Sequence, residues 1–519
     1  MTACDVDRLS IGNNRFRIAV TPPRISIMDI FRTKSVDELR EASYRESHFR
    51  RELHGWQLIL LGIGCIIGTG IFVLTGTAAA QHAGPAIAIS FVVSALGCLC
   101  SALCYSEFAS MLPVTGSAYT YAYATMGEFI AWIIGWDLIL EYLFGASTVA
   151  VGWSGYVSQL LSDYGIHLPT AFSQAPLDFA QDHLVTTGAV LNVPAVLIVA
   201  IVTSVLVIGI RESAGTNAVI VLIKVAAVLL FIITCAPHIQ SQNWTPFIPP
   251  NTGRVGEFGW TGILAGAGVI FYAYIGFDAV TTAAQEAKTP TRDVPIGVVG
   301  SLLICTVLYV LVSLVLTGVV NYKELNVPAP VAYAVERVGP GVSWTKTFIE
   351  LGAIAGLSSV VLVLLLAQPR IFYQMALDGL LPRTFARVHS RFRTPFVTTL
   401  LTGAVTAVIA GLFPVQVLGE LVSIGTLLAF TIVCGCVIIL RRTRPDLERR
   451  FRTPWNPVVP ALGVVICLAQ MVFLPVATWT RLLVWLVIGF IIYFAYGRRY
   501  SLLNAARAKT DSGTPGSRS

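Results

Sequence analysis

Charged residues are scarce in this chain, since Asp, Glu, Lys and Arg make up only 12% of its 519 residues. A soluble globular protein carries about 25%, so the composition excludes an ordinary soluble protein. None of the seven histidines lies deep in an apolar run, which argues against a histidine proton relay or metal site. The ten cysteines include no CxxC pair. Nine of them lie in apolar segments, and we interpret them as small packing residues rather than disulfides or metal ligands.

Apolar residues, by contrast, make up 55% of the chain. They recur in runs of roughly 20 residues, long enough for a helix to cross a hydrocarbon core of about 30 Å. The sequence therefore predicts an all-α membrane protein with 12 transmembrane helices. We expect these helices near 56–80, 86–110, 128–156, 194–210, 216–236, 260–284, 295–318, 347–369, 396–413, 418–440, 458–475 and 482–497.

Basic residues are distributed unevenly between the two sides of the predicted membrane domain. With the N-terminus in the cytoplasm, 29 of the 35 Lys and Arg residues fall in cytoplasmic segments. This positive-inside bias predicts a multi-pass protein of the cytoplasmic (inner) membrane with both termini cytoplasmic. It leaves no concentrated basic surface for nucleic acid. The remaining basic residues are Arg254, Lys323, Arg337, Lys346 and Arg481 on the outer side and Lys224 inside a helix.

The predicted helices form one domain between two tails. Residues 1–55 are expected to be a cytoplasmic tail with a short amphipathic helix at 37–53, and Met28 is an alternative start. The transmembrane domain covers 56–497. Residues 498–519 are polar and are predicted to be a disordered cytoplasmic tail. We identify no cleavable signal peptide, because the first apolar run is long enough to remain as a helix.

Two of the predicted helices carry clusters of glycine. The first has glycines at 62, 64, 68 and 70, and the sixth has glycines at 266, 268 and 276. The sixth helix starts five helices after the first. A repeat of five helices crosses the membrane an odd number of times, so the second repeat has the opposite orientation to the first. The two glycine-rich points can therefore meet near the membrane midplane. We predict a first repeat at 56–236, a second at 260–440 and two extra helices within 458–497.

A helix can be interrupted inside a membrane only where its freed backbone groups face protein, water or ligand. At Gly68, Thr69 and Gly70 the free N–H groups and the positive helix end suit a carboxylate. Freed carbonyl groups nearby suit an ammonium group, and together the two describe a site for a zwitterion. The carbonyl groups concerned are those of Ile66, Tyr272, Ala273 and Ile275. The alternative is ordinary close packing, since Gly64 and Gly68 have the small-xxx-small spacing.

Lys224 lies eight residues into the fifth predicted helix, about 12 Å along its axis. A lipid-facing lysine at a helix centre costs roughly 2.5–3.5 kcal/mol, so a functional role is favoured. Burial favours the neutral amine, which would let this side chain bind and release the coupling proton. The alternative is a lysine that snorkels toward the cytoplasm or pairs permanently with an acid.

Four acidic residues lie in or near the predicted helices. Asp137 and Glu141 are four residues apart on one helix face, and Asp278 follows the break in the sixth helix. We predict that Glu141 and Asp278 line the cavity and act in gating or side-chain recognition. Glu107 and Asp137 lie nearer the cytoplasmic ends, where caps or structural salt bridges are expected.

Four stretches give the chain a resemblance to the amino acid, polyamine and organocation (APC) superfamily, and to the bacterial relatives of its cationic amino acid transporters. They are 62–76 (GIGCIIGTGIFVLTG), 116–123 (GSAYTYAY), 272–280 with 286–297 (YAYIGFDAV and EAKTPTRDVPIG) and 370–382 (RIFYQMALDGLLP). The resemblance implies a leucine-transporter-like inverted-repeat fold, with the substrate carboxylate at the first-helix glycines. Cys65 and Ala376 depart from the usual pattern.

In the family that the chain resembles, proton-coupled members carry a lysine on the fifth helix where sodium-coupled relatives bind their ion, and Lys224 fits that position. The resemblance implies a secondary active amino acid importer that works by proton symport. A proton-independent exchanger or facilitator of cationic amino acids, a channel or intramembrane enzyme, and a nutrient sensor are the alternatives. The expected partners are an amino acid, a proton and the lipid bilayer, with a small accessory membrane subunit left open. No cofactor, metal or enzymatic activity is expected.

Overall fold

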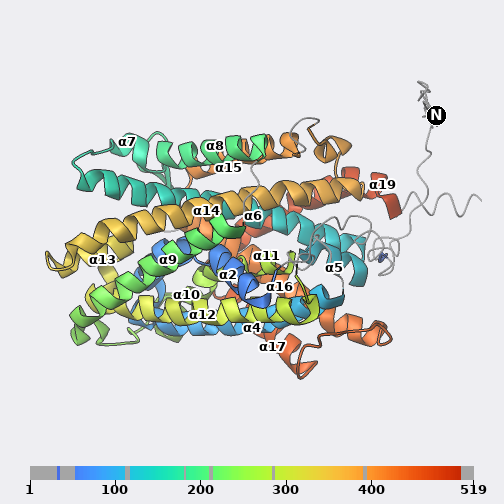
Figure 1. The fold of residues 1–519 in the computed structure, drawn as a ribbon, viewed down its shortest axis with the longest axis horizontal. Helices are drawn as coiled ribbons and strands as arrows, with labels where there is room; N and C mark the ends of the chain where they lie inside the picture. The colour runs from blue at the N-terminus through green and yellow to red at the C-terminus, as the bar shows by residue number, and fades with distance from the viewer. Residues whose placement is uncertain are drawn as a thin grey trace, which may run out of the picture.

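The computed structural model describes residues 32–34, 53–111, 117–180, 183–209, 214–282, 287–389 and 394–503. Met28, most of the predicted amphipathic helix at 37–53 and most of the predicted C-terminal tail lie outside these residues. The chain is mostly helical, as predicted, and its long helices run along one common direction (Figure 1).

The first half of the chain contains one two-stranded hairpin among its helices. The hairpin lies between α7 and α8, and its strands pair antiparallel with Leu177 opposite Thr186. The elements are α2 (Gly55–Ile66), η2 (Gly70–Leu74), α3 (Thr75–Ala78), η3 (Ala79–Ala83), η4 (Gly84–Ala86), α4 (Ile87–Met111), α5 (Ser117–Thr125), α6 (Glu128–Asp163), α7 (Thr170–Ser173), β1 (Leu177–Ala180), β2 (His183–Thr186), α8 (Val193–Ile208) and α9 (Ala214–Cys235).

The second half is helical in every named element. These are η5 (Ala236–His238), η6 (Ser241–Trp244), α10 (Gly259–Ile270), η7 (Phe271–Tyr274), α11 (Phe277–Thr282), α12 (Pro290–Val319), η9 (Tyr322–Glu324), α13 (Pro330–Val338), α14 (Ser343–Leu377), η10 (Arg383–Ala386), α15 (Phe396–Leu412), α16 (Val415–Thr443), α17 (Val458–Val472), α18 (Val476–Ile492), η11 (Tyr493–Gly497) and α19 (Arg498–Tyr500).

Each of the twelve predicted apolar segments contains helix. Within the described part of the chain, seven helical stretches are long and apolar enough to cross a membrane, and five further apolar helices are shorter. The long stretches are Gly70–Met111, Glu128–Asp163, Ala218–His238, Pro290–Val319, Ser343–Leu377, Val415–Thr443 and Val476–Tyr500. Two helices extend well beyond their predicted ends, since α6 reaches Asp163 and α14 covers 343–377. The division into two inverted repeats stays a prediction.

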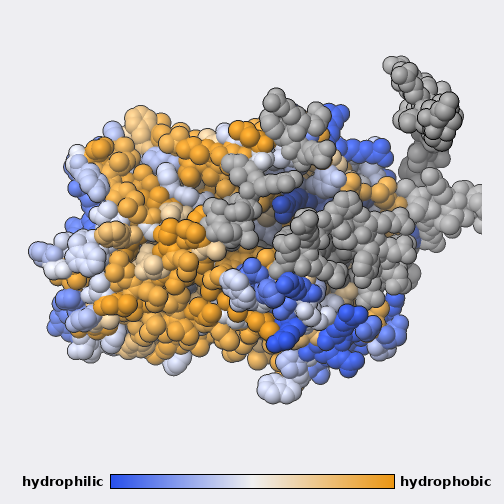
Figure 2. Space-filling model, in the orientation of Figure 1, coloured by the Kyte–Doolittle hydropathy of each residue, from blue (hydrophilic) through white to orange (hydrophobic). Residues whose placement is uncertain are grey.

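On the face shown in Figure 2, a broad apolar band crosses the middle of the molecule, and polar side chains gather toward its two ends. Large apolar side chains are exposed on the described helices, for example Leu222 and Ile233 on α9 and Val465 on α17. So much exposed apolar surface would be unfavourable in water but not against lipid tails. The chain is therefore an integral membrane protein.

The two chain ends described by the structure meet at one end of the molecule (Figure 1). Lys34 forms an ion pair with Asp378, which follows α14. The backbone N–H of Leu502 donates to the carbonyl of the same aspartate at 3.1 Å. The described chain ends therefore lie on one side of the bundle, which fits the predicted topology, and the cytoplasmic assignment of that side stays a prediction.

The interrupted helices lie at the centre of the bundle. The helix α2 packs against α12 and α9, whereas α10 packs against α4 and α16. The longest helices, α6 and α14, pack along each other and cover the same centre from the other side. This arrangement encloses the breaks in protein, which is the condition for irregular backbone at membrane depth.

Candidate functional site

The first helix breaks at the predicted glycines. The helix α2 ends at Ile66, and Ile67 is extended, with φ −71° and ψ 104°. Helical geometry resumes at Thr69 and leads into the π-helical turn η2 at Gly70. The first N–H groups of a helical stretch have no acceptor within that stretch, so the backbone at 68–70 presents donors and a positive helix end to an anion.

The sixth helix breaks as predicted, but by a different turn. The helix α10 tightens into the 3-10 turn η7, and Ile275 is extended, with φ −60° and ψ 140°. Gly276 follows with φ +113°, a backbone conformation that disfavours residues with a Cβ atom. The helix α11 then starts at Phe277. One glycine in a left-handed conformation therefore redirects the chain between the two halves.

The two breaks contact each other through backbone. A Cβ atom added at Gly70 would lie 2.3 Å from the Cα of Ala273, and one added at Gly276 would lie 2.8 Å from the Cβ of Cys65. Gly68 differs, because an added Cβ would meet only Val360 of α14, at 3.4 Å. Gly70 and Gly276 are therefore close-packing positions as well as parts of the breaks.

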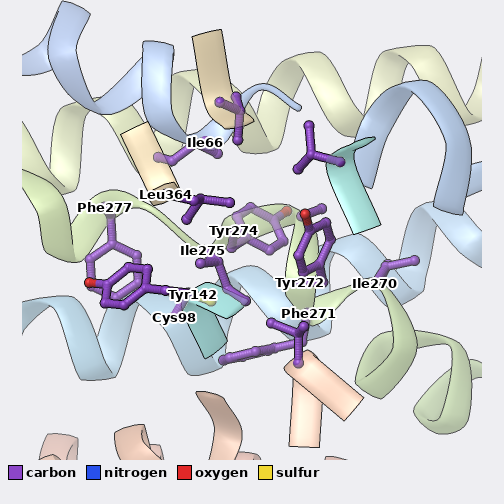
Figure 3. Close-up of a cluster of buried hydrophobic side chains, with 14 of the residues drawn as sticks. Ile66, Cys98, Tyr142, Ile270, Phe271, Tyr272, Tyr274, Ile275, Phe277 and Leu364 are labelled. Atoms are coloured by element: carbon purple, nitrogen blue, oxygen red, sulfur yellow. The ribbon is translucent and has the colours of Figure 1, made fainter. Parts of the chain in front are cut away.

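A cavity of about 60 Å³ lies between the two breaks, α6 and α14. Six of the seven predicted substrate residues line it, and Ala273 is the exception. Figure 3 shows Leu364 of α14 between Ile66 and Ile275, with Tyr272 beside them. The lining residues are Cys65, Ile66, Gly68, Thr69, Gly70, Tyr142, Gly145, Tyr272, Ile275, Gly276, Val360, Val363, Leu364 and Ala367.

Tyr309 of α12 is a residue that the sequence analysis missed. Its hydroxyl oxygen lies 2.8 Å from the carbonyl oxygen of Ile66 and 2.9 Å from that of Ala273. A hydroxyl has one proton and donates to one of these carbonyls at a time. Two carbonyl groups predicted to bind the substrate ammonium are thus bridged by one tyrosine. A buried tyrosine in an apolar helix is usually a packing residue, so the sequence carried no signal for this role.

Replacing Tyr309 with Phe is expected to destabilise the site. The variant leaves the buried carbonyls of Ile66 and Ala273 without this donor, which costs about 1–3 kcal/mol. Thermal unfolding of the purified protein should show a lower midpoint and uptake should fall. Tyr164→Phe, at an exposed tyrosine, is the matched control. Equal midpoints for the two variants would contradict the bridging role.

Lys224 is fully buried and points at the end of α2. Its Nζ donates to the carbonyl of Gly64 at 2.6 Å and to that of Ile67 at 3.2 Å. These carbonyls lie at the negative end of the α2 dipole, where a cation is stabilised. The side chain packs on Gly356 of α14, where an added Cβ would lie 2.9 Å from its Cγ. Snorkelling toward the cytoplasm is therefore wrong for this conformation.

Of the two acids predicted to line the cavity, Glu141 is not among the described lining residues. Glu141 is buried in α6, one residue before Tyr142, which does line it. The backbone of Asp278 belongs to α11, and its side chain lies outside the described atoms. Their roles in gating or side-chain recognition stay predictions.

The other two acids, Glu107 and Asp137, differ in their hydrogen-bond and ion-pair partners. Glu107 forms ion pairs with Arg441 and Arg449, which confirms the expected structural salt bridge. Asp137 was assigned a similar role, and this was wrong. It is fully buried, and neither of its carboxyl oxygens has a hydrogen-bond partner. These ion pairs are possible because the last turn of α16, with Arg441, and the loop after it, with Arg449, lie against α4, a long-range contact that spacing does not reveal.

A second, larger cavity of about 320 Å³ lies at the end of the molecule away from the termini. The hairpin, α6 and the loop before α16 contribute to its wall. Gly152 of α6 lines this outer cavity, and an added Cβ there would lie 2.8 Å from Thr69 and 3.2 Å from Val73. Thr69 also lines the first cavity, called the inner cavity below, so this contact joins the walls of the two cavities.

Comparison with known proteins agrees with this architecture. The sequence pattern of the family described as "Amino acid permease" matches residues 53–495. The chain is 46% identical to the methylthioribose transporter and to the branched-chain amino acid permease BcaP of Bacillus subtilis (strain 168), over 92% of this chain and 99% of either protein. It is 39% identical to cationic amino acid transporter 4, vacuolar, of Arabidopsis thaliana, over 80% of this chain and 68% of that protein. The chain belongs to the amino acid permease family of the APC superfamily.

Proposed function

We propose that this protein is a secondary active transporter that imports amino acids across the cytoplasmic membrane by alternating access. Twelve membrane-crossing helices in a 5+5 inverted repeat, with two extra helices and both termini cytoplasmic, are part of the proposal. The observation that carries it is the cavity between two broken helices, with backbone donors on one wall and carbonyls nearby. A site formed by two broken helices suits a carrier rather than a channel.

The proposed binding mode uses backbone groups for the part that all amino acids share. The substrate carboxylate accepts hydrogen bonds from the N–H groups at Gly68, Thr69 and Gly70, at the positive end of the outer half-helix. The ammonium group lies at the carbonyls near Ile66, Tyr272 and Ile275, where the first half-helix and η7 end. Recognition by backbone leaves the side chains of the cavity free to select the substrate.

The apolar walls of the cavity favour a neutral, apolar substrate side chain. Val360, Val363 and Leu364 form the α14 wall, and the described lining residues include no charged side chain. A cationic substrate would bring an unpaired charge into this wall, which is costly. The relative BcaP, which is named for branched-chain amino acids, agrees with this preference. We therefore propose branched-chain or similarly apolar amino acids over cationic ones.

Thermal unfolding of the purified protein with single ligands tests this proposal. A ligand at 100 times its dissociation constant stabilises the native state by about 2.7 kcal/mol, so Leu, Ile or Val should raise the unfolding midpoint while Arg and Lys should not. Methylthioribose belongs in the panel, because one relative is named for its transport. A rise with Arg or Lys alone would contradict the apolar preference, and a rise with methylthioribose alone would reassign the substrate class.

The coupling ion is proposed to be a proton carried by Lys224. Protonated Lys224 holds the carbonyls of Gly64 and Ile67 more strongly than the neutral amine can, since charge strengthens a hydrogen bond. Because the two protonation states of Lys224 bind these carbonyls with different strength, protonation can favour one conformation of the first break over another. The second candidate is exchange without proton coupling, and counterflow measured with and without a pH gradient separates the two.

A further inference from the structure

Glu350 of α14 is a buried acid that the proposed mechanism does not use. Its side chain is fully buried, and neither carboxyl oxygen has a hydrogen-bond partner. It lies about 10 Å along α14 from Ser343, near the end of the molecule away from the termini (Figure 1). A buried carboxylate without partners is strongly disfavoured, so the neutral, protonated form is the one that suits this arrangement.

The lysine one helical turn from Glu350 already has two partners. Lys346 donates to Asp163 at the end of α6 at 2.8 Å and to Glu336 of α13 at 2.9 Å. Positions four apart lie on one helix face, so Lys346 is also within reach of Glu350. The lysine therefore has three acidic neighbours, and in this conformation it bonds to the two that lie on other helices.

The helix α13 connects this cluster to the substrate site. It packs against α14 on one side and against η2, the outer half of the broken first helix, on the other. Under the proposed alternating access, outward opening moves η2 and, with it, α13 away from α6 and α14. Such a movement separates Glu336 from Lys346, and the lysine then loses one of its two carboxylate partners.

We propose that Glu350 is a proton-binding site that controls closure of the outer path. With α13 in place, Asp163 and Glu336 hold Lys346 and Glu350 keeps its proton. When α13 moves away, Glu350 releases the proton to the outer water and its carboxylate pairs with Lys346. The closed form thus binds one proton more than the open form, so acid on the outer side favours closure and alkali favours opening.

The groups around Glu350 support this assignment. The charged and titratable groups that interact with it are Asp163 and Tyr156 from α6, Glu336 from α13 and Lys346 from its own helix. The hydroxyl group of Tyr156 donates a hydrogen bond to the carbonyl of Phe72 in η2, at 2.8 Å. The α9 lysine, Lys224, packs on Gly356, about 9 Å farther along α14. The lysine that can change partners is therefore Lys346.

The proposal rests on the proposed alternating access but is tested without transport. A Thr77→Cys probe lines the outer cavity and is 4% exposed in the closed form. Its reaction with a membrane-impermeant maleimide is measured in vesicles without substrate or gradient. Val255→Cys, 78% exposed, gives the reference rate that corrects for thiol ionisation. The corrected rate should rise with pH from about 4.3, the ordinary pKa of a glutamate, until the closed form also loses its proton, by up to about tenfold per unit for one proton.

Three variants decide the outcome. Glu350→Gln should hold the corrected rate at its acid value at every pH, whereas Glu350→Asp should keep the pH dependence. Glu257→Gln, which removes an exposed carboxylate in the loop before α10, should behave as the parent protein. If Glu350→Gln fails to fold, Lys346→Met takes its place and should abolish the dependence as well. The proposal is overturned if the corrected rate still depends on pH in Glu350→Gln, or in Lys346→Met where that variant takes its place. It is also overturned if the parent protein shows no pH dependence.

A Lys224→Met variant separates this proposal from the proposed function. The corrected labelling rate should keep its pH dependence in that variant, because Lys224 is not in the Glu350 cluster. Loss of the dependence with Lys224→Met and its retention with Glu350→Gln would overturn the Glu350 proposal in favour of Lys224. Normal labelling in a protein that transports no amino acid would instead contradict the proposed function alone.

Discussion

Uphill uptake of amino acid driven by a pH gradient is expected to disappear when Lys224 is replaced with Met. A gradient of one pH unit is worth 1.36 kcal/mol per proton, so symport of one proton with a neutral amino acid supports about tenfold accumulation. Without the ammonium group, the carbonyls of Gly64 and Ile67 lose their charged donor, and protonation can no longer bias the first break. Accumulation in proteoliposomes should then fall to the level of equilibration.

The control for this variant removes a lysine elsewhere. Lys323→Met acts at an exposed residue of the loop after α12 and should leave accumulation unchanged. Counterflow should survive Lys224→Met if the lysine couples the proton and the binding site itself remains. Uphill, pH-dependent uptake by Lys224→Met would rule out Lys224 as the coupling group, and loss of accumulation together with intact counterflow would exclude a general folding defect.

Gly70→Ala is expected to cause the largest loss of transport among single-methyl changes in the site. The added Cβ would lie 2.3 Å from the Cα and Cβ of Ala273 and 3.1 Å from its backbone nitrogen. Backbone atoms cannot move aside as a flexible side chain can, so the two breaks must separate. Overpacking of this kind costs about 1–3 kcal/mol. Because it displaces the donors proposed for the carboxylate, we expect uptake to fall by more than about tenfold.

Gly435→Ala is the matched control for Gly70→Ala. Gly435 also lies in a membrane helix, α16, and an added Cβ there meets no atom within 4 Å. In a helix interior, alanine is preferred to glycine by roughly 1 kcal/mol, so this variant should be as active and at least as stable. Radiolabelled uptake and thermal unfolding measured on both variants test the prediction. Normal uptake by Gly70→Ala would mean that the two breaks need not touch during transport.

The positions of the helices were largely predictable from sequence. Apolar runs flanked by polar residues defined all twelve segments, because a helix in lipid must be apolar over its whole lipid-facing length. Their ends were less accurate. The end of α6 extends to Asp163, and α14 begins at Ser343, because these turns lie beyond the apolar run and are stabilised by contacts such as the Lys346–Asp163 ion pair. Polar residues at a helix end carry no hydropathy signal.

The site was predictable where the backbone itself is special. Glycines marked both breaks, because interruption of a membrane helix needs residues that tolerate unusual backbone angles or close approach. Six of the seven residues chosen on this basis line the inner cavity. Tyr309 and Glu350 were not found. Tyrosine is common in apolar helices, and a glutamate near a helix end is ordinary unless one knows that its carboxyl oxygens are buried without partners.

By itself, the sequence determined the class of molecule: an apolar helical chain with two glycine-rich breaks and one lysine inside a helix. These are properties of single segments, since hydropathy, helix propensity and glycine tolerance act locally. Only the tertiary structure decided which groups meet: Lys224 with the carbonyls at the end of α2, Tyr309 across both breaks, and Lys346 of α14 with Asp163 of α6. Such pairings join residues far apart in the chain, and they depend on how the helices pack rather than on the spacing of residues along any one of them.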